Sequence, residues 1–175
     1  VTILAGQTTA VINVAVLDES LIEDSETVSV TLTGITSGDS NIALGSTVSD
    51  TVTIADNDTG VVTLAANDAA AAEPNNNGQF TVTLSNASST DTVISYSVTG
   101  SATAGSDYTT LTGSVTILAG QTTAVINVAV LDENLIEASE TVVVTLTGIT
   151  SGDSNIALGS TVTDTVTIAD NDTGV

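Results

Sequence analysis

Residues 132–140 read DENLIEASE and place four carboxylates within nine positions, and residues 18–26 repeat this stretch as DESLIEDSE. The chain contains no Lys, Arg or His, so no side chain can neutralise these acids. Clustered carboxylate oxygens are the ligands that hard divalent cations such as Ca²⁺ prefer. The stretch therefore predicts a cation site, and its recurrence predicts a repeat protein.

The repeat has a period of 114 residues, since Val1 corresponds to Val115 and Val61 to Val175. A period of this length suits a whole small domain better than one turn of a solenoid. We therefore expect residues 1–58 to be the C-terminal half of one repeat and residues 59–175 to be one complete repeat. The missing strands of the first repeat either precede Val1 in the same chain, which we prefer, or come from a neighbouring chain in a polymer. Only four of the 61 aligned positions differ: Ser20/Asn134, Asp24/Ala138, Ser29/Val143 and Ser49/Thr163.

The composition indicates a folded acidic protein. A net charge of −21 accompanies 41% hydrophobic residues, whereas a disordered acidic segment would be poor in Val, Ile and Leu. The absence of cationic side chains argues against nucleic acid as a partner. No apolar run approaches the roughly 20 residues of a membrane span. There is no Cys, so disulfides cannot stabilise the fold.

The residue pattern predicts strands throughout and no helix. β-Branched residues alternate with Thr and Ser between Gly, Asn and Asp turn signals. Strict alternation would turn Asp164 inward, so we expect a bulge near this residue or a later start of the last strand. Seven short strands predict an all-β, immunoglobulin-like β-sandwich for each tandem domain. In the complete repeat they are expected at residues 61–66, 79–85 and 92–99, directly after Gly113, and at residues 122–131, 141–147 and 161–169.

The predicted topology gathers the acids at one end of the sandwich. If consecutive strands are antiparallel, alternate connections lie at the same end, and nine of the 12 Asp and Glu residues from Thr59 onward fall at the first end. Polar loops and acidic surfaces are common and aid solubility. Carboxylates packed together without Lys or Arg nevertheless repel and raise one another's pKa. We therefore favour a multi-ion Ca²⁺ site that holds roughly two to four ions per complete domain.

Five sequence elements, in this order along the repeat, resemble the Calx-beta domain. They are Glu73 ahead of GQFTV at 78–82, GSDY at 105–108, LAGQ at 118–121, DENLIEASE at 132–140 and the closing VTIADND at 166–172.

This family is known from the calcium-sensing regulatory region of sodium/calcium exchangers, from integrin β4 and from many large bacterial surface proteins. The resemblance implies a seven-stranded sandwich with Ca²⁺ at one end. Asn171 departs from the family pattern, because the exchanger domains have a carboxylate there, although an amide oxygen can still bind a cation. Asp24 aligns with Ala138, so neither position is expected to be an essential ligand. In the complete repeat the resemblance implies metal-ligand roles for Glu73, Asp107, Asp132, Glu133, Glu137, Glu140, Asp170, Asn171 and Asp172. By repeat identity the same roles fall in the first copy to Asp18, Glu19, Glu23, Glu26, Asp56, Asn57 and Asp58.

The expected function is structural. We predict a Ca²⁺-binding spacer repeat of a long extracellular adhesin or surface filament, with identical repeats joined head to tail and the ions stiffening the junctions. Self-assembly of chains into filaments is left open. The alternative is a Ca²⁺-dependent module that binds a glycan or protein, or a Ca²⁺ sensor. Paired carboxylates also serve glycoside hydrolysis, but a repeated cluster without His or an aromatic-lined pocket predicts no enzyme and no catalytic residues.

Overall fold

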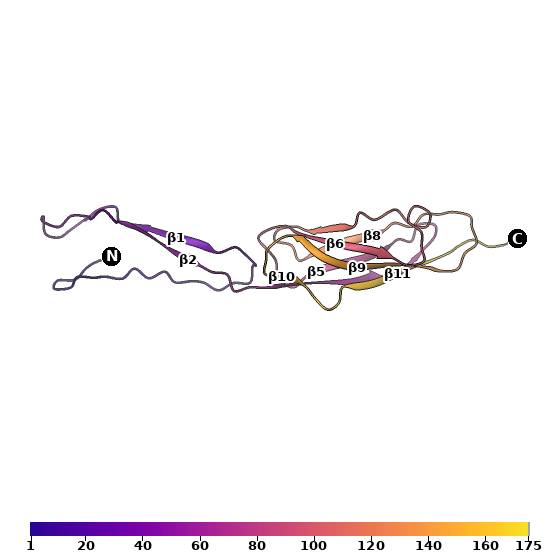
Figure 1. The fold of residues 1–175 in the computed structure, drawn as a ribbon, viewed down its shortest axis with the longest axis horizontal. Coiled ribbons are helices and arrows are strands. Elements are labelled where there is room, and N and C mark those ends of the chain that lie inside the picture. Colours follow the sequence, from indigo (N-terminus) through magenta and orange to yellow (C-terminus); the bar gives the residue numbers. More distant parts are fainter. Residues whose placement is uncertain (175) are drawn as a thin grey trace. The chain divides into compact units, whose positions relative to one another are not determined.

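The computed structural model of the chain describes residues 1–174, all of which lie in strands, turns and loops. No helix that could cross a membrane was found in this part of the chain. The chain divides into two compact units. The first consists of Val1–Glu19 with Asp24–Asp56, and the second consists of Ser20–Glu23 with the residues from Asn57 onward. Figure 1 shows the paired strands β1 (Glu26–Thr31) and β2 (Ser49–Ile54) in the first unit and the remaining strands in the second.

The second unit is a β-sandwich of two sheets (Figure 1). One sheet has the strand order β10-β3-β5-β8, and the other has the order β4-β11-β9-β6-β7. Neighbouring strands pair antiparallel except for the short strands β10 and β4, which pair parallel with β3 and β11. The strands are β3 (Gly60–Asp68), β4 (Ala70–Ala72), β5 (Gly78–Leu84), β6 (Thr92–Thr99), β7 (Ser114–Ile117), β8 (Thr123–Val128), β9 (Glu140–Ser151), β10 (Ile156–Leu158) and β11 (Thr163–Ala169).

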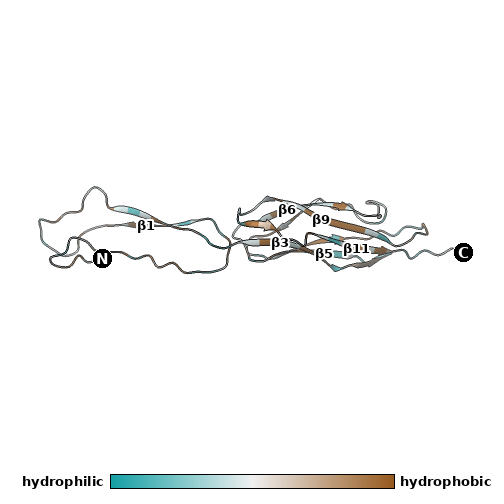
Figure 2. Ribbon diagram, turned by 60° about the horizontal axis from the view of Figure 1, so that its bottom comes forward, coloured by the Kyte–Doolittle hydropathy of each residue, from teal (hydrophilic) through white to brown (hydrophobic). Residues whose placement is uncertain are grey.

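Aliphatic side chains from both sheets form one core. Every second residue is buried along β5 and over residues 142–146 of β9, which is the two-residue period of a strand with one face packed. Figure 2 shows the hydrophobic stretches on β3, β9 and β11 in brown. Phe80, Leu64 and Ile94 are among the largest fully buried side chains. At roughly 25 cal/mol for each Å² of apolar surface buried, this core is the main source of stability for a domain without disulfides.

The predicted sandwich and its seven strands are confirmed, with corrections at the strand ends. The strand expected at 122–131 ends at Val128, and the strand expected at 141–147 extends from Glu140 to Ser151. Strands β4 and β10 were not predicted, because their three-residue sequences have no clear alternation. The last strand begins late, at Thr163, and its register with β9 is continuous, so no bulge lies near Asp164. The Asp164 carboxylate instead accepts a hydrogen bond from the Ala66 N–H at 2.7 Å, which explains its half-buried position.

The first unit contains only two of the strands expected in its sequence. Strand β1 (Glu26–Thr31) pairs antiparallel with β2 (Ser49–Ile54). The described residues Val1–Ile3 and 9–14, which align with β7 and β8, form no strand. In the second unit β7 and β8 pair with β6 and β5, and the first copy has no counterpart of β5 or β6. These two segments therefore have no partner strands like those of β7 and β8 among the described residues of the first unit.

Candidate metal centre

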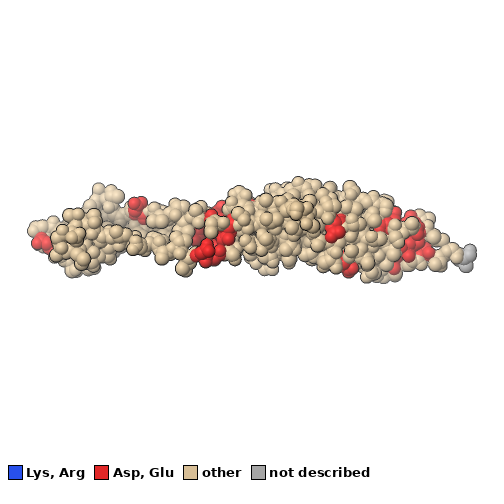
Figure 3. Space-filling model, turned by 90° about the horizontal axis from the view of Figure 1, so that it is seen from below, with Lys and Arg blue, Asp and Glu red and all other residues tan. Residues whose placement is uncertain are grey.

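Acidic side chains gather where three connections and the segment after β11 meet. The connections run from β4 to β5, from β6 to β7 and from β8 to β9. Figure 3 shows the Asp and Glu side chains in red near the C-terminal end of the second unit, with no Lys or Arg among them. The predicted segregation of acids therefore brings residues from distant parts of the sequence together at one end of the sandwich.

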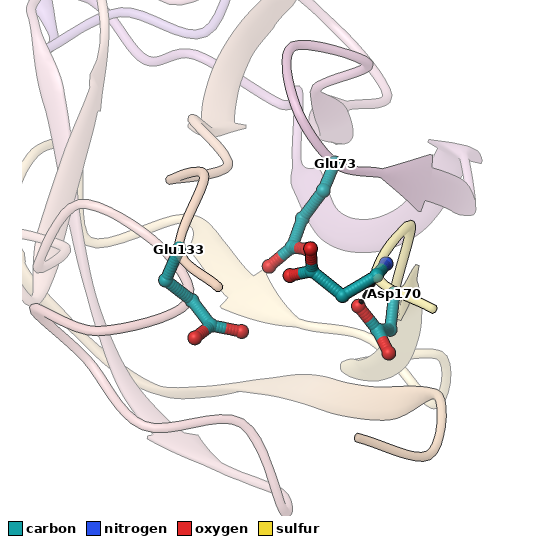
Figure 4. Close-up of side chains that lie close together, drawn as sticks. Glu73, Glu133 and Asp170 are labelled. Carbon is teal, nitrogen blue, oxygen red and sulfur yellow. Dashed lines mark hydrogen bonds between the residues drawn. The ribbon is translucent and has the colours of Figure 1, made fainter. Parts of the chain in front are cut away.

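The first group, which we name the Glu73 cluster, consists of Glu73, Glu133, Asp170 and Asp172. All four side chains are half-buried, and one carboxylate oxygen from each lies within 4.8 Å of the others. In Figure 4 the carboxylates of Glu73, Glu133 and Asp170 point toward a common space. Four carboxylates this close carry enough negative charge and enough oxygens to bind a divalent cation.

Strand pairing positions the Glu73 cluster. The parallel pairing of β4 with β11 aligns Ala72 with Ala169. The Glu73 N–H then donates to the Ala169 carbonyl at 3.1 Å, which sets Glu73 beside the start of the acidic segment after β11. Within that segment the Asp172 N–H donates to the Asp170 carboxylate at 2.8 Å. The tight turn places both of these carboxylates at the same end of the domain as Glu73.

The second group, which we name the Asp107 cluster, consists of Asp107, Glu137 and Glu140. Their closest carboxylate oxygens also lie within 4.8 Å of one another. Asp107 is buried, Glu140 is half-buried and Glu137 is exposed. This cluster therefore has one side in the domain and one side open to solvent.

Backbone hydrogen bonds hold Asp107 against the segment that follows β8. The Leu131 N–H donates to the Asp107 carbonyl at 2.9 Å, and the Thr109 N–H donates to the Ala129 carbonyl at 2.8 Å. The Asp107 carboxylate accepts a hydrogen bond from the Thr103 N–H. Gly100 permits the close approach of this loop to β9, since a Cβ there would clash with the Thr141 carbonyl oxygen.

Asp170 connects the two clusters. Its carboxylate accepts a hydrogen bond from the Glu137 N–H at 2.8 Å, so a member of the Glu73 cluster fixes the backbone of a member of the Asp107 cluster. Hydrogen bonds from the Asp172 and Glu137 N–H groups lower the pKa of Asp170 below its usual value. Asp170 therefore remains charged over the whole neutral range.

Three carboxylate oxygens of the Glu73 cluster are buried without a hydrogen-bond partner among residues 1–174. They are Glu73 Oε2, Glu133 Oε1 and Asp172 Oδ2. Buried polar atoms are nearly always satisfied, and a buried charged oxygen without a partner is costly. A bound cation would satisfy all three oxygens together, so the residues present fit a divalent metal ion.

The pKa shifts have the direction expected for crowded carboxylates. A hydrogen bond to Asp107, followed by burial and repulsion from the neighbouring acids, raises the pKa of Glu140 to about 7. Burial, with repulsion from nearby carboxylates, also raises the pKa of Glu73, Glu137 and Asp172. A divalent cation would lower all of these values, because it favours the charged form of each group.

The other predicted ligands lie apart from the two clusters. Among the described residues, Asp132 is exposed and is not one of the clustered carboxylates, and its Oδ1 accepts a hydrogen bond from the Asn171 amide at 3.2 Å. In the first copy, Asp18, Glu19 and Glu26 are exposed and Asp56 is half-buried, and all four belong to the first unit. Glu23, Asn57 and Asp58 belong to the second unit. No counterpart of Glu73 or Asp107 occurs in the first copy.

One residue of the acidic stretch was not singled out from the sequence. Ile22 has no exposed surface and belongs to the core of the second unit. The only available signal was the Leu-Ile pair inside the charged stretch at residues 18–26, which recurs at 135–136. An apolar pair in a solvated acidic loop needs a covering partner or a binding role.

Comparison with solved structures shows the fold. The chain is similar to the crystal structure of the apo-form Calx CBD1 domain, with a TM-score of 0.53 and 18% identity over 66% of this chain and 100% of that chain. It is similar to CBD12 from CALX1.2, with a TM-score of 0.52 and 18% identity over 64% of this chain and 46% of that chain. The calcium binding domain CBD12 of CALX1.1 matches with a TM-score of 0.50 and 22% identity over 59% of this chain and 41% of that chain.

A search of curated protein sequences gave no match. The family comparison gave a match in each copy of the repeat. Residues 1–58 and residues 56–172 both match the family model of the Calx-beta domain. The chain therefore belongs to the Calx-beta family.

Proposed function

We propose that this chain is a Ca²⁺-binding spacer module of a long extracellular adhesin or surface filament. The observation that carries the proposal is the Glu73 cluster, in which buried carboxylate oxygens lack partners and no cationic side chain exists to neutralise them. Membership of the Calx-beta family supports Ca²⁺ as the ion, and so does the similarity to CBD12 of CALX1.1, which is a calcium binding domain.

Ca²⁺ suits this donor set better than other common ions. All the clustered ligands are oxygens and none is Cys or His, which disfavours zinc and copper. Mg²⁺ prefers a small octahedral shell with several waters, and crowded carboxylates suit it poorly. With one ion in the Glu73 cluster and one in the Asp107 cluster, the domain would hold two ions, at the lower end of the predicted range. Each cluster would use carboxylates together with backbone carbonyls and water.

Near-identity of tandem repeats favours the spacer role over the alternatives. A receptor or sensor needs one or two competent copies, whereas a long filament needs many similar ones. The acids after β2 end at Asp58, and β3 begins at Gly60, so the link between repeats is too short to behave as a flexible coil. Ca²⁺ bound by residues that flank this link would remove part of its remaining freedom. Millimolar extracellular Ca²⁺ suits sites of low affinity, and the role requires no catalysis.

Small-angle scattering of the chain tests the spacer mechanism. We expect Ca²⁺ to narrow the distribution of maximum dimensions relative to the chain in chelator, because bound ions stiffen the junction. The Asp68→Asn variant should show the same Ca²⁺-dependent narrowing, since Asp68 is exposed, lies in β3 and is outside both clusters. Identical distributions with Ca²⁺ and with chelator would contradict the mechanism. A Ca²⁺-dependent change only on addition of a glycan or partner would favour the binding-module alternative.

A further inference from the structure

The Leu-Ile pair of the acidic stretch lies in opposite environments in the two copies. Ile22 is fully buried, whereas the aligned Ile136 is 59% exposed. At a core position of the repeat the difference is reversed. Ile3 in the first copy is 58% exposed, whereas the aligned Ile117 in the second copy is 1% exposed. Ile22 is therefore buried for a reason that does not depend on a complete core in its own repeat.

Ile22 packs into the domain formed by the following repeat. It belongs with Ser20–Glu23 to the second unit, and it is part of the same hydrophobic core as Leu84 and Ile156. If a Cβ were added to Gly60, it would lie 2.7 Å from Ile22 Cδ1, 2.7 Å from Leu84 Cδ1 and 3.3 Å from Ile156 Cγ1. A larger residue at position 60 would force the ends of these side chains to shift, so the glycine lets all three meet as they do here.

Backbone hydrogen bonds fix the same segment. The Ile22 N–H donates to the Ala87 carbonyl at 2.9 Å, and the Ile22 carbonyl accepts from the Ser89 N–H at 2.9 Å. These bonds form a parallel bridge between Ile22 and Ser88, which is itself buried. An isoleucine side chain and two backbone groups thus join one repeat to the domain of the next.

The C-terminal end of the chain contains the first part of the same arrangement. Gly174 aligns with Gly60, and a Cβ at Gly174 would lie 3.6 Å from Ile136 Cδ1. Gly60 is buried and Gly174 is exposed, and the residues around Gly60, among them Leu84 and Ile156, all follow it in the chain. Leu135 and Ile136 form an apolar surface, 61% and 59% exposed, in an otherwise acidic loop.

We propose that Ile136 is a docking residue whose partner is a following copy of this repeat, which it enters as Ile22 enters the domain of residues 60–174. Each repeat then completes the core of the next one with its loop isoleucine. The inference rests on the tandem array of the proposed function but not on Ca²⁺. The partner is a second copy of the domain, because the same Leu-Ile sequence fills the same socket within this chain.

The 175-residue chain tests the occupied socket with a matched pair of variants. Ile22→Ala should lower the thermal midpoint of the second unit by roughly 5–15 °C, as for other buried Ile→Ala changes. Ile136→Ala, in nearly identical local sequence, should leave the midpoint unchanged. In wild type the Ile22 amide should exchange hydrogen slowly and the Ile136 amide quickly. Equal shifts for the two variants, or fast exchange at both amides, would overturn the assignment of Ile22.

Appending a further copy of residues 62–175 after Val175 tests the docking of Ile136. In this extended chain Ile136→Ala should lower the unfolding midpoint by roughly 5–15 °C, and exchange of the Ile136 amide should slow by roughly a hundredfold or more. An Ile136→Ala variant without effect and an unprotected amide would overturn the proposal.

Each measurement is made with excess Ca²⁺ and with chelator. If Ile136→Ala leaves the unfolding midpoint of the extended chain unchanged both with Ca²⁺ and with chelator, the inference is refuted even if Ca²⁺ stabilises the domain. If Ile136→Ala lowers the midpoint but Ca²⁺ does not raise it, the proposed metal function is refuted and the docking inference is supported.

Discussion

The two copies of the repeat differ at four of 61 aligned positions, yet they bury their apolar side chains very differently. Ile117 is 1% exposed and Val166 is fully buried, whereas the aligned Ile3 and Val52 are 58% and 48% exposed. The second copy has strands β5 and β6 as partners, and the first copy has no counterpart of either. Burial of these positions in this chain therefore depends on pairing with strands such as β5 and β6 and not on the sequence of the half repeat alone.

The largest expected effect compares the core position in the two copies. Ile117→Ala should reduce the free energy of unfolding of the second unit by about 2–5 kcal/mol, because it leaves a cavity in a packed core. Ile3→Ala should change stability by no more than about 0.5 kcal/mol, since the side chain is already exposed. Urea unfolding of both variants measures the difference. Comparable losses would show that the first copy packs a core of its own.

Much of this comparison could be predicted from the sequence, because alternation of apolar residues identified seven of the nine strands of the sandwich. Phe80 and Val144 lie on the apolar phase of the alternation in the strands expected at 79–85 and 141–147, and both are fully buried. The short strands β4 and β10 could not be predicted, since they arise from parallel pairing at the sheet edges. The loss of strand structure at residues 9–14 depends on missing partners and not on local propensity.

The site was predicted less completely than the fold. Strand topology correctly brought Glu73, Asp107 and Asp170 to one end, because alternate connections of an antiparallel sandwich share an end. Sequence alone could not divide the acids into two clusters or assign Asp170 its bond to the Glu137 N–H, since both depend on loop geometry. The burial of Ile22 depends on the following domain and has no signature in the alternation pattern.

The second expected effect concerns a proposed ligand, Glu73, that only the complete copy contains. Glu73→Gln should weaken Ca²⁺ binding by roughly tenfold or more, because it removes a charge from a cluster with unsatisfied buried oxygens. Asp68→Asn removes the same charge from an exposed position outside the clusters and should change the affinity little. Calorimetric titration of the two variants measures this. Equal losses would mean that overall charge, and not coordination, determines binding.

A smaller effect is expected from pH in the metal-free chain. Glu140 has its pKa raised from 4.5 to about 7 in the folded state, so between these values the folded chain holds a proton that the unfolded chain releases. The stability from this group is fully present below about pH 4.5 and is lost as pH rises through about 7. Urea midpoints in chelator should therefore fall from about pH 5 to about pH 8, and Glu140→Gln should reduce the fall.

Excess Ca²⁺ provides the control for this pH dependence. Bound Ca²⁺ stabilises the charged form of Glu140, so this group no longer needs a proton in the folded state. The Ca²⁺-loaded chain should therefore not lose stability over the same pH range. Metal-free stability that increases between about pH 5 and about pH 8 would contradict the crowding of carboxylates at this end.

The smallest expected effect uses one of the four differences between the copies. Asp24→Ala should change stability and Ca²⁺ binding very little, since Ala138 occupies the aligned position. Glu137→Ala, in the complete copy, should reduce the Ca²⁺-dependent rise in the unfolding midpoint, because Glu137 belongs to the Asp107 cluster. Differential scanning calorimetry of the two variants with and without Ca²⁺ separates ligands from bystanders. A larger loss for Asp24→Ala would contradict the assignment.

Thermal unfolding of the unaltered chain, with excess Ca²⁺ and with chelator, tests the metal site most directly. Removing the ions restores repulsion among the clustered carboxylates and leaves the buried oxygens of Glu73, Glu133 and Asp172 without partners. We expect the unfolding midpoint of the second unit to be higher by roughly 10 °C or more in Ca²⁺ at about a hundred or more times its dissociation constant. Mg²⁺ at the same concentration should give a smaller rise. An unchanged midpoint with Ca²⁺ and with chelator would contradict the presence of a metal site.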